Sequence, residues 1–484
     1  MIKDFYNEFY RHIRDSDADC YIQYDERFKY KEMHNIMLRM NSILSNYTRA
    51  KVGIYADKSF LNYTAIAATL LSNNIWIPFN PKIPDARNLE MMDVAQPSLI
   101  LADKALPPAI AAFASSKGIK VEILEQLASI EDEKGFDFSL IKANEVAMVY
   151  FTSGSTGLPK GVPLTHENYI VNVRNILQIL SLKKGEVFAD YHDLAFVISV
   201  PIVFPCIMTE SAIAPATSRQ DIMFPIKNLT ENNVTVLITV PSTLARIRQM
   251  ESNGLPRCNI RTLIMCGEPF HLDLLEYALE KVKAKYIFNF YGSTEVGPWT
   301  FYQRCTTGDM QRFAKYGMVP IGAPIKGNLI EVTCEDELCV SGPQVTPGYL
   351  ENVNADRFYE KGGNRWFLTG DKVICDDGFY ICKGRLDSQV KVGGYRIELT
   401  DIEAHLRSIP GVDAAICFVS GEEPTKFIVS ILHSQEEIAL PTVRKHLKSR
   451  LPVYMLPRKV VVLKKMPLNK SGKIDRVQLL EQHT

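Results

Sequence analysis

The chain has 484 residues, of which 46% are hydrophobic and 23% charged, and its 55 Lys and Arg residues balance 55 Asp and Glu residues. This composition excludes a disordered or collagen-like chain, and the zero net charge argues against a general nucleic-acid binder, which needs an excess of Lys and Arg. At about 150 residues per domain, the length predicts two or three domains.

The sequence indicates neither a membrane segment nor a zinc cluster. The longest apolar run, Leu194 to Met208, is too short to span a bilayer, and its residues Pro201 and Pro205 favour buried strand and turn. The first residues carry charge instead of an apolar signal-peptide core. The ten cysteines show no C-x-x-C or Cys/His spacing, so we expect reduced thiols in a cytoplasmic protein with no membrane partner.

In the first two-thirds of the chain, short β-rich runs alternate with longer amphipathic stretches. We predict strands at 52–57, 75–79, 146–151, 234–240, 261–266 and 285–290, and helices at 63–71, after Thr165, from Pro241 onward and at 272–282. Continuous apolar strands that alternate with helices indicate parallel sheets buried on both faces. Ligands of such sheets bind beyond the carboxyl ends of the strands.

After about Gly322 the sequence changes to short strands and Gly-rich turns. We predict antiparallel hairpins around 337–342 and 377–382, then a domain boundary near 385–387. Beyond it, helices at 402–408 and 441–450 and strands at 414–419 and 427–432 predict a compact α+β unit. The predicted domains are therefore 1–385 and 386–484.

A loop rich in glycines and hydroxyls follows the strand at 146–151. Residues 152–161 read Thr-Ser-Gly-Ser-Thr-Gly-Leu-Pro-Lys-Gly, a group of donors suited to anionic oxygens, to which Lys160 adds a positive charge. Its spacing does not match G-x-x-x-x-G-K-[ST], G-x-G-x-x-G or G-x-S-x-G. A flexible surface turn is the alternative, which the buried strand before the loop disfavours.

This loop resembles the phosphate-binding signature of the adenylate-forming superfamily, which includes acyl-CoA synthetases, nonribosomal-peptide adenylation domains and luciferases. Six further segments resemble motifs of that family in the same order: 266–268, 289–295, 368–371, 384–396, 451–457 and 467–473. The chain is most similar in texture to stand-alone ligases that load carrier proteins, such as the D-alanine–carrier protein ligases.

The resemblance implies a fold, a reaction and cofactors. The fold would be α/β, with a large N-terminal domain of parallel or mixed sheets sandwiched by helices, a small distorted barrel, and a small mobile α+β C-terminal domain. The reaction would join a carboxylic acid to ATP with Mg²⁺, giving an acyl-adenylate and pyrophosphate, and would then pass the acyl group to a thiol.

The resemblance also assigns catalytic roles. Lys473 would be the cation at the α-phosphate, where negative charge gathers as pyrophosphate leaves. Glu295 would hold Mg²⁺ together with Thr156, since one carboxylate plus phosphate oxygens suits that hard ion. Taken alone, Lys473 also fits an exposed lysine of a basic tail, and Glu295 also fits an ordinary surface carboxylate.

The family's nucleotide pocket maps onto further residues. Tyr291 would stack on adenine, and Asp371 would accept hydrogen bonds from the ribose hydroxyls beside Arg385. The alternatives are a core tyrosine and a salt bridge at the domain hinge. The remaining ATP-binding residues implied by the resemblance are Thr152, Ser153, Gly154, Ser155, Thr156, Lys160, Gly267, Glu268, Asn289, Gly292, Ser293 and Thr294.

Two positions correspond to the family's domain movement and thiol passage. Asp387 falls where the C-terminal domain turns between an orientation for adenylation and one for thiol transfer. An ordinary linker residue is the alternative reading of Asp387. Gly394 would let the pantetheine arm pass close to the backbone.

The substrate pocket departs from the pattern of amino-acid-activating members, which carry an aspartate for the α-ammonium. A gapless register places Val197 at that position, and a buried ammonium without its carboxylate costs several kcal/mol. We therefore expect an alkyl or aryl acid in an apolar pocket. The predicted pocket residues are Phe196, Val197, Val200, Cys266 and Pro298.

Two polar residues upstream leave an alternative open. Asp193 would take the ammonium role only if the register slips by four residues. His192 and Asp193 would otherwise form a proton relay or, more simply, cap a turn.

The thiol acceptor is the other open point. Residues 444–476 contain eleven Lys or Arg and a single acid, Asp475. Such a patch would attract an acidic acyl or peptidyl carrier protein, or the phosphates of CoA, unless it is only a solvated face. Nucleic acid is disfavoured because stacking aromatics are not interleaved. We expect a carrier-protein ligase; an acyl-CoA synthetase, a silent binding homologue and a luciferase-like oxygenase are the alternatives.

Overall fold

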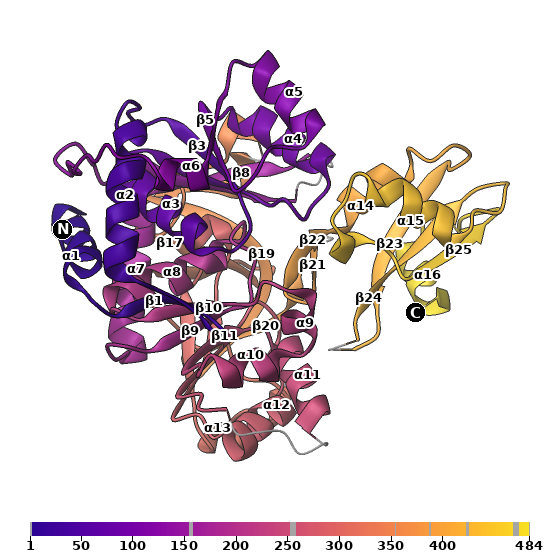
Figure 1. The fold of residues 1–484 in the computed structure, drawn as a ribbon. Helices are drawn as coiled ribbons and strands as arrows, with labels where there is room; N and C mark the ends of the chain where they lie inside the picture. The colour runs from indigo at the N-terminus through magenta and orange to yellow at the C-terminus, as the bar shows by residue number, and fades with distance from the viewer. Residues whose placement is uncertain are drawn as a thin grey trace.

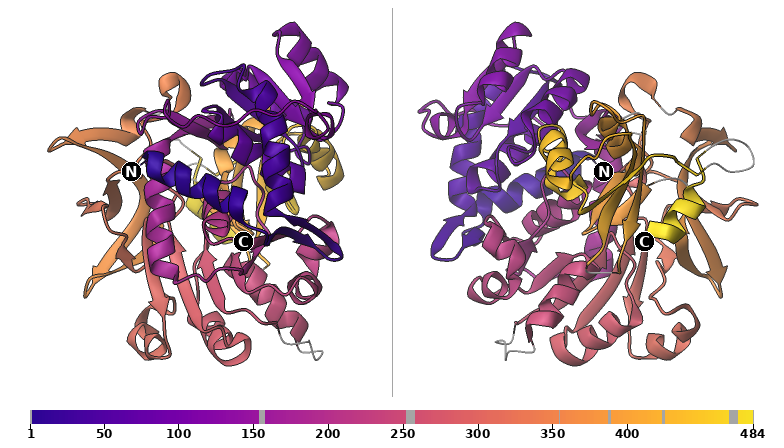
Figure 2. Two further views of the ribbon diagram at one scale, coloured as in Figure 1. Left: turned by 60° about the vertical axis from the view of Figure 1, so that its left-hand side comes forward. Right: turned by 90° about the vertical axis from the view of Figure 1, so that its right-hand side faces the viewer.

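The computed structural model describes residues 2–153, 158–251, 258–353, 355–386, 389–422, 425–467 and 474–483. A large domain contains two helix-covered sheets and a smaller third sheet, and a small C-terminal domain stands beside it (Figure 1). In the right-hand view of Figure 2 the small domain lies over the middle of the large one. The position of the boundary at residue 385 stays a prediction.

The first large sheet has six strands in the order β6-β5-β3-β4-β7-β8 and is parallel except for β8, which pairs antiparallel with β7. The strands predicted at 52–57, 75–79 and 146–151 are thus found, whereas β8 was not predicted. The elements are β3 (Lys51–Tyr55), β4 (Ile75–Phe79), β5 (Leu99–Ala102), β6 (Lys120–Ile123), β7 (Val146–Thr152), β8 (Lys160–Thr165), α3 (Phe60–Leu71), α4 (Asp85–Ala95), α5 (Pro108–Ser116) and α6 (Leu124–Ala128).

The second sheet has nine strands in the order β15-β14-β13-β12-β11-β9-β10-β1-β2, parallel from β13 to β1 and antiparallel at both edges. Its strands are β1 (Asp19–Gln23), β2 (Glu26–Lys29), β9 (Val187–Asp190), β10 (Ala212–Pro215), β11 (Val236–Thr239), β12 (Thr262–Cys266), β13 (Tyr286–Tyr291), β14 (Phe301–Cys305) and β15 (Ala323–Pro324). Its helices are α1 (Ile2–Asp15), α2 (Tyr30–Leu44), α7 (His166–Leu180), α8 (Val200–Met208), α9 (Arg219–Met223), α10 (Pro225–Glu231), α11 (Pro241–Glu251), α12 (Leu272–Tyr277) and α13 (Gly308–Arg312).

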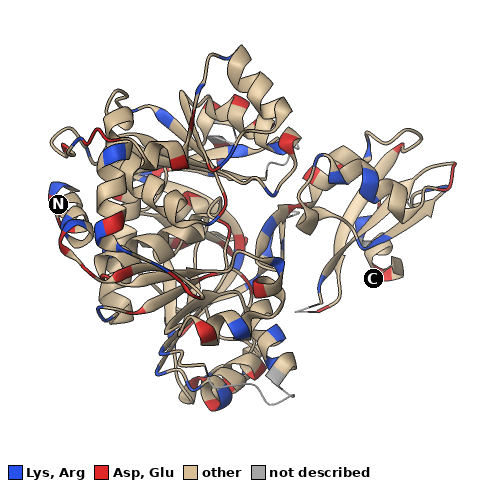
Figure 3. Ribbon diagram, viewed as in Figure 1, with Lys and Arg blue, Asp and Glu red and all other residues tan. Residues whose placement is uncertain are grey.

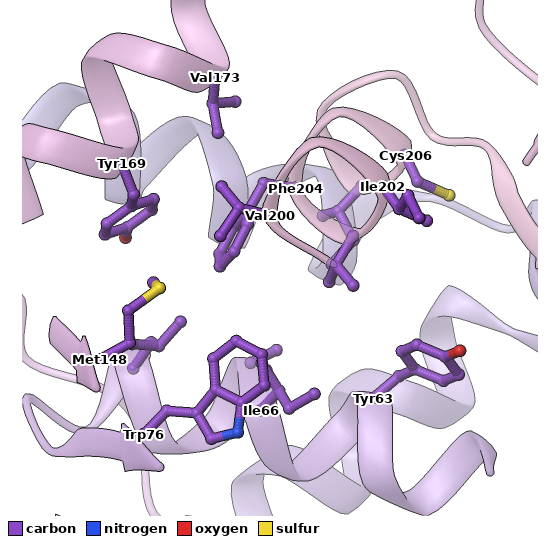
Figure 4. Packing of buried hydrophobic residues seen from close by; sticks show 14 of the residues in the cluster. Tyr63, Ile66, Trp76, Met148, Tyr169, Val173, Val200, Ile202, Phe204 and Cys206 are labelled. Carbon is purple, nitrogen blue, oxygen red and sulfur yellow. The ribbon is translucent and has the colours of Figure 1, made fainter. Parts of the chain in front are cut away.

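The main core lies between these two sheets, where α3, α7 and α8 meet (Figure 4). Trp76 of β4, Tyr169 of α7 and Phe204 of α8 are each 1% exposed. Burying one such side chain contributes about 2 kcal/mol. Helix α7 begins where predicted because the Thr165 and Asn168 side chains each accept the other's backbone N–H.

The apolar run at 194–208 does not form the predicted strand and turn. A short 3₁₀ turn (Val197–Ser199) leads into α8, and all residues of α8 are buried. Pro201 lies in the first helical turn, where a missing N–H costs nothing, and burial on every side outweighs the hydrogen bond that Pro205 removes.

The third sheet contains the predicted hairpins but forms no closed barrel in the part of the chain described. Its antiparallel order is β16-β17-β19-β18, with β20 also on β19. The long strand β19 pairs with β18 at its start and with β20 at its end, so the sheet bends along β19 without closing. The strands are β16 (Leu329–Val332), β17 (Glu337–Ser341), β18 (Phe358–Lys361), β19 (Asn364–Asp376) and β20 (Phe379–Arg385).

The C-terminal domain is the α+β unit that the sequence predicts. A hairpin, β21–β22, points at the large domain, and a three-stranded sheet β23-β24-β25 carries the helices (Figure 1). The elements are β21 (Gln389–Val392), β22 (Tyr395–Glu398), α14 (Leu399–Leu406), β23 (Ala414–Ser420), β24 (Phe427–His433), α15 (Leu440–Lys448), β25 (Lys459–Leu463) and α16 (Arg476–His483). No described helix is long and apolar enough to cross a membrane.

Candidate active site

A cavity of about 300 Å³ opens beyond the carboxyl ends of β11, β12 and β13, where the sheet order predicts a ligand site. Thr239, Cys266 and Phe290 line it from those strands, and Gly394 and Tyr395 line it from the β21–β22 hairpin. The site therefore lies between the two domains.

Asp371 and Arg385, predicted at the ribose, line this cavity, and Tyr291, predicted at the adenine, is hydrogen-bonded to Asp371. Asp371 and Arg385 face each other across β19 and β20, and Arg385 Nη1 donates to Asp371 Oδ1 at 2.9 Å. The Tyr291 hydroxyl donates to the other carboxylate oxygen, Oδ2, at 2.5 Å. Burial, together with the Asp371 charge, raises the pKa of Tyr291 well above its usual value. Three separate motifs thus form one hydrogen-bonded group.

Glu295 is 1% exposed, so its carboxylate lies in the interior of the protein. Burial acts to raise its pKa, but the Arg396 guanidinium and nearby hydrogen bonds outweigh burial and lower it to about 2. Arg396 Nη1 donates to Glu295 Oε2 at 2.8 Å, and the Tyr349 hydroxyl donates to Oε1 at 2.9 Å. Both carboxylate oxygens therefore have partners, one of them from the C-terminal domain.

The start and end of the predicted phosphate loop lie opposite each other on β7 and β8, where Thr152 pairs with Lys160. Ser153 contacts the C-terminal domain, since its hydroxyl oxygen accepts from Glu398 N at 3.2 Å. Lys160 is buried beside the Tyr349 ring, with Nζ 5.8 Å from the ring centroid, and burial lowers its pKa. The remaining loop residues assigned above, Gly154, Ser155 and Thr156, lie outside the described residues, as do Asp387 and Lys473.

Other predicted nucleotide residues have local structural partners. Glu268 accepts from both the backbone N–H and the hydroxyl of Ser242, at the start of α11, and Gly267 before it has a φ of +82°. A Cβ at Gly292 would lie 2.4 Å from the Pro298 carbonyl oxygen, so the backbone there already requires a glycine. Asn289 donates to the Pro320 carbonyl at 2.9 Å and its buried Oδ1 has no hydrogen-bond partner in the described chain. Ser293 and Thr294 line the cavity.

The predicted acyl pocket is only partly as expected. Phe196, Val197, Cys266 and Pro298 line the cavity. Val200 instead is fully buried in the core between the sheets (Figure 4), because α8 turns it away from the cavity. The pocket is also less apolar than predicted, since His192, Asp193, Arg246 and Lys391 line it too.

The glycine pair of the β21–β22 hairpin sits at the mouth of the cavity. Gly393 and Gly394 have φ values of +58° and +81°, which a tight two-residue hairpin requires. A Cβ at Gly394 would lie 2.6 Å from Val240 Cγ1, so only glycine allows this approach. The following Tyr395 stacks on Tyr454 with ring centroids 3.9 Å apart and meets the Phe196 ring edge-on.

Arg396, Tyr349 and the ion pair between Arg87 and Asp401 were not assigned roles from the sequence. Arg87 Nη2 lies 2.8 Å from Asp401 Oδ2 and joins α4 to α14 across the domain interface. Arg396 ends the segment 384–396 quoted above, so its motif marked it. Tyr349 and Arg87 lie outside every quoted motif, and nothing in the sequence around them indicated a contact with the site or with the C-terminal domain.

Comparison with known proteins gives the family. Residues 11–350 match the AMP-binding enzyme family, and residues 401–473 match the AMP-binding enzyme C-terminal domain. The chain belongs to the AMP-binding enzyme family. This confirms the resemblance to adenylate-forming enzymes, and enzymes of this AMP-binding family use ATP.

Relatives of this AMP-binding enzyme match along nearly the whole chain. D-alanine–D-alanyl carrier protein ligases from Staphylococcus epidermidis and Listeria innocua are each 26% identical to it, with 94% and 96% of both chains covered, respectively. In three dimensions it is similar to a double mutant of o-succinylbenzoate CoA synthetase from Bacillus subtilis, with a TM-score of 0.84, 21% identity and 98% of each chain covered. This last likeness concerns the fold alone.

Proposed function

We propose that the protein is an AMP-forming acid–thiol ligase that adenylates a carboxylic acid with ATP and transfers the acyl group to the phosphopantetheine thiol of a carrier protein. The observation that carries the proposal is a cavity lined by Asp371, Arg385 and Gly394, whose wall residues Asp371 and Arg396 are hydrogen-bonded to Tyr291 and Glu295. The carrier protein ligases among the relatives agree with it.

In this proposal the nucleotide lies along the wall formed by β13 and β19. The Asp371 carboxylate, held by Arg385, accepts from the ribose hydroxyls, and Tyr291 presents its ring to the base. The Thr152–Thr156 loop donates to phosphate oxygens and Lys160 adds positive charge.

Magnesium fits the donor set of this site. Glu295 has a lowered pKa, and its hydrogen-bond partner Tyr349 lies beside Lys160 at the end of the predicted phosphate loop. No described group of three or more His, Cys, Asp or Glu could form an all-protein metal cage. Mg²⁺ is usually held by one or two carboxylates plus substrate phosphates. Glu295 and Thr156 would hold the ion, which would neutralise phosphate charge when bound.

Two orientations of the C-terminal domain serve the two steps. For adenylation, Lys473 is brought to the α-phosphate, where a preorganised positive charge stabilises the transition state. For transfer, the hairpin is placed as described here, with Gly394 against Val240 and Arg396 on Glu295. Asp387 is the proposed hinge between the two orientations.

A basic groove favours a carrier protein as acceptor. Arg444, Lys445 and Lys448 are exposed on α15, where Figure 3 shows several basic residues, and line a hollow of about 830 Å³ together with Arg219 of the large domain. Positive charge on both sides of the domain interface would speed the encounter with an acidic partner. We also propose a cytoplasmic location, where ATP is available, because all ten cysteines are free thiols.

The test separates the two half-reactions. ATP–pyrophosphate exchange across a panel of carboxylic acids measures adenylation, and the purified acyl-adenylate is then offered either holo-carrier protein or free CoA. We expect acid-dependent exchange and faster transfer to the carrier. No exchange with any acid would refute the ligase, and faster transfer to CoA would make it an acyl-CoA synthetase.

The basic groove has a matched control within the chain. Lys464 and Lys465 are also exposed, but they follow β25 and do not line the groove. Charge reversal of Arg444 and Lys448 should slow carrier loading more than reversal of Lys464 and Lys465. Equal effects would show that net charge, and not the groove, attracts the carrier.

A further inference from the structure

Arg87 and Asp401 form a buried ion pair between the two domains. Arg87 is in α4, which packs on the first sheet, and Asp401 is in α14 of the C-terminal domain (Figure 1). Arg87 Nη2 lies 2.8 Å from Asp401 Oδ2, and the two side chains are 6% and 0% exposed. Water therefore hardly reaches this contact, which exists only while the two domains are docked as the structure shows.

The Asp401 carboxylate depends on Arg87. Among the described residues, the side chain that donates a hydrogen bond to it is Arg87, through Nη2. The other carboxylate oxygen, Oδ1, has no hydrogen-bond partner there and lies 3.5 Å from His405 Nε2. Burial lowers the pKa of His405 to about 4, so this ring is neutral near pH 7 and supplies no positive charge. Removing Arg87 would therefore leave the Asp401 charge buried without a cation.

Simpler roles for the two residues do not require the contact. Asp401 lies in the first turn of α14, where a carboxylate stabilises the helix through its dipole, but an exposed carboxylate does this equally well. Arg87 Nη1 also lies 3.0 Å from Glu90 Oε2 in its own helix, so Asp401 is not needed to balance the charge of Arg87. Helix stability and local charge balance thus leave the contact between the domains unexplained.

The pair is suited to select an orientation of the domains rather than to strengthen their association. Burial raises the pKa of Asp401 to about 6 from an ordinary value of 3.8, although the Arg87 charge acts to lower it. Burying the charged carboxylate in this environment therefore costs more than Arg87 offsets. Buried ion pairs of this kind add little stability, but any arrangement that leaves one partner buried alone is strongly penalised.

The ion pair and the hairpin contact lie on different sheets of the large domain. Gly394 of the hairpin meets Val240, which directly follows β11 of the second sheet. Asp401 instead meets α4, which packs on the first sheet. Because the two contacts are on different sheets, together they determine how the C-terminal domain is rotated and not only that it is docked.

We propose that Arg87 is a positioning residue for thiol transfer, which acts through Asp401 to set the orientation that places the Gly394 hairpin at the cavity, and that it has no part in adenylation. This rests on the proposed ligase activity and on the assignment of the described orientation to the transfer step. In this role Arg87 touches no reacting group. It acts on the rate through the fraction of enzyme molecules in the transfer orientation.

The experiment removes the pair one partner at a time. Arg87→Met leaves the Asp401 charge unpaired, so transfer from purified acyl-adenylate should slow by about 10²-fold near pH 7, whereas pyrophosphate exchange should change far less. The double variant Arg87→Met, Asp401→Asn has no unpaired charge, and its transfer rate should recover to within about fivefold of the natural rate. Glu90→Gln is the matched control, because Glu90 contacts Arg87 within α4, and it should leave both half-reactions nearly unchanged.

The unpaired carboxylate also gives a pH signature. The groups that face Asp401 are Arg87, Glu90, Glu398, His405 and Tyr454, and only Arg87 is a cation near pH 7. Docking of Arg87→Met then requires Asp401 to take up a proton. Its transfer rate should therefore rise toward the natural rate as the pH falls from about 8 toward 6, and the double variant should show no such rise.

Two results would overturn the proposal, since each indicates a merely structural role: equal losses in both half-reactions of Arg87→Met, or no recovery in the double variant. Absence of exchange with any acid would instead refute the ligase itself. If Arg87→Met does not fold, hydrogen exchange of the natural enzyme decides. The amides of α4 and α14 should be better protected with purified acyl-adenylate than with ATP, and equal protection would overturn the role of Arg87 in transfer.

Discussion

Replacing Arg396 by methionine should uncouple the two half-reactions. Arg396 reaches from β22 of the C-terminal domain to Glu295 of the large domain, with 2.8 Å between Nη1 and Oε2. Methionine keeps the apolar stem but leaves the Glu295 charge without its cation in this orientation. The adenylation orientation, in which Mg²⁺ is the proposed partner of Glu295, does not use the contact.

The magnitude follows from the pKa of Glu295. The difference between its ordinary value of 4.5 and about 2 corresponds to roughly 3 kcal/mol in favour of the charged form. With Glu295 only 1% exposed, solvent screens little of this, and breaking a buried pair costs about 3–5 kcal/mol. The transfer orientation should therefore become about 10²-fold less populated.

The assay measures exchange and transfer separately. Arg396→Met should slow transfer from supplied acyl-adenylate by about 10²-fold and change pyrophosphate exchange far less. In the background of Glu295→Gln, which has no charge to strand, the same substitution should slow transfer little. Equal losses in both half-reactions, or additive effects in the double variant, would refute the role of the pair.

The same pair gives a signature in acid. Because the folded pKa of Glu295 is below its unfolded value, its contribution to stability is complete above about pH 4.5 and is lost as the pH falls toward 2. Thermal melting of Arg396→Met should therefore depend less on pH over that interval than melting of the natural enzyme.

The other proposed roles have assays of their own. Lys473→Ala should lower pyrophosphate exchange by several orders of magnitude but largely spare transfer from supplied acyl-adenylate; equal losses would remove it from the α-phosphate. Asp371→Ala should raise the Kd of ATP more than Tyr291→Phe, which removes only one of its hydrogen bonds; unchanged ATP affinity would exclude Asp371 from the ribose site. Carrier loading should slow with added salt, since the Debye length is about 10 Å at 0.1 M, and the paired reversal of Arg444 and Lys448 should flatten that dependence; salt-independent loading would count against an acidic partner.

Much of the fold could be predicted because apolar runs and capping signals coincide. The buried strands β3, β4, β12 and β13 are bounded runs of apolar residues, and Thr165 marks the start of α7. The prediction of strand and turn for residues 194–208 was wrong because a fully buried helix and a buried strand are equally apolar, so periodicity cannot distinguish them. β8 was missed because its role depends on pairing with β7, which is a tertiary property.

The convergence of Asp371, Arg385 and Tyr291 was predictable because each lies in a quoted motif, whereas their roles at ribose and adenine stay predictions. Asp371, Arg385 and Tyr291 converge although about 80 to 95 residues separate Tyr291 from the other two. The prediction that Val200 lines the acyl pocket was wrong for a different reason. Val200 comes directly after a short 3₁₀ turn, and the start of the helix there points its side chain at the core. A gapless register lists positions but not the directions of their side chains.

The same limitation explains why the substrate class could not be taken from position 197. A buried ammonium requires a carboxylate within reach, and the fold, not the sequence register, decides which acids lie on the cavity wall. Residues 193–196 form a turn closed by the Phe196 N–H and the Asp193 carbonyl, which brings Asp193 to the same cavity as Val197. Asp193 and Val197, four positions apart in the sequence, therefore line the same cavity. Position 197 alone thus does not fix the substrate class, because the structure also places Asp193 at this cavity.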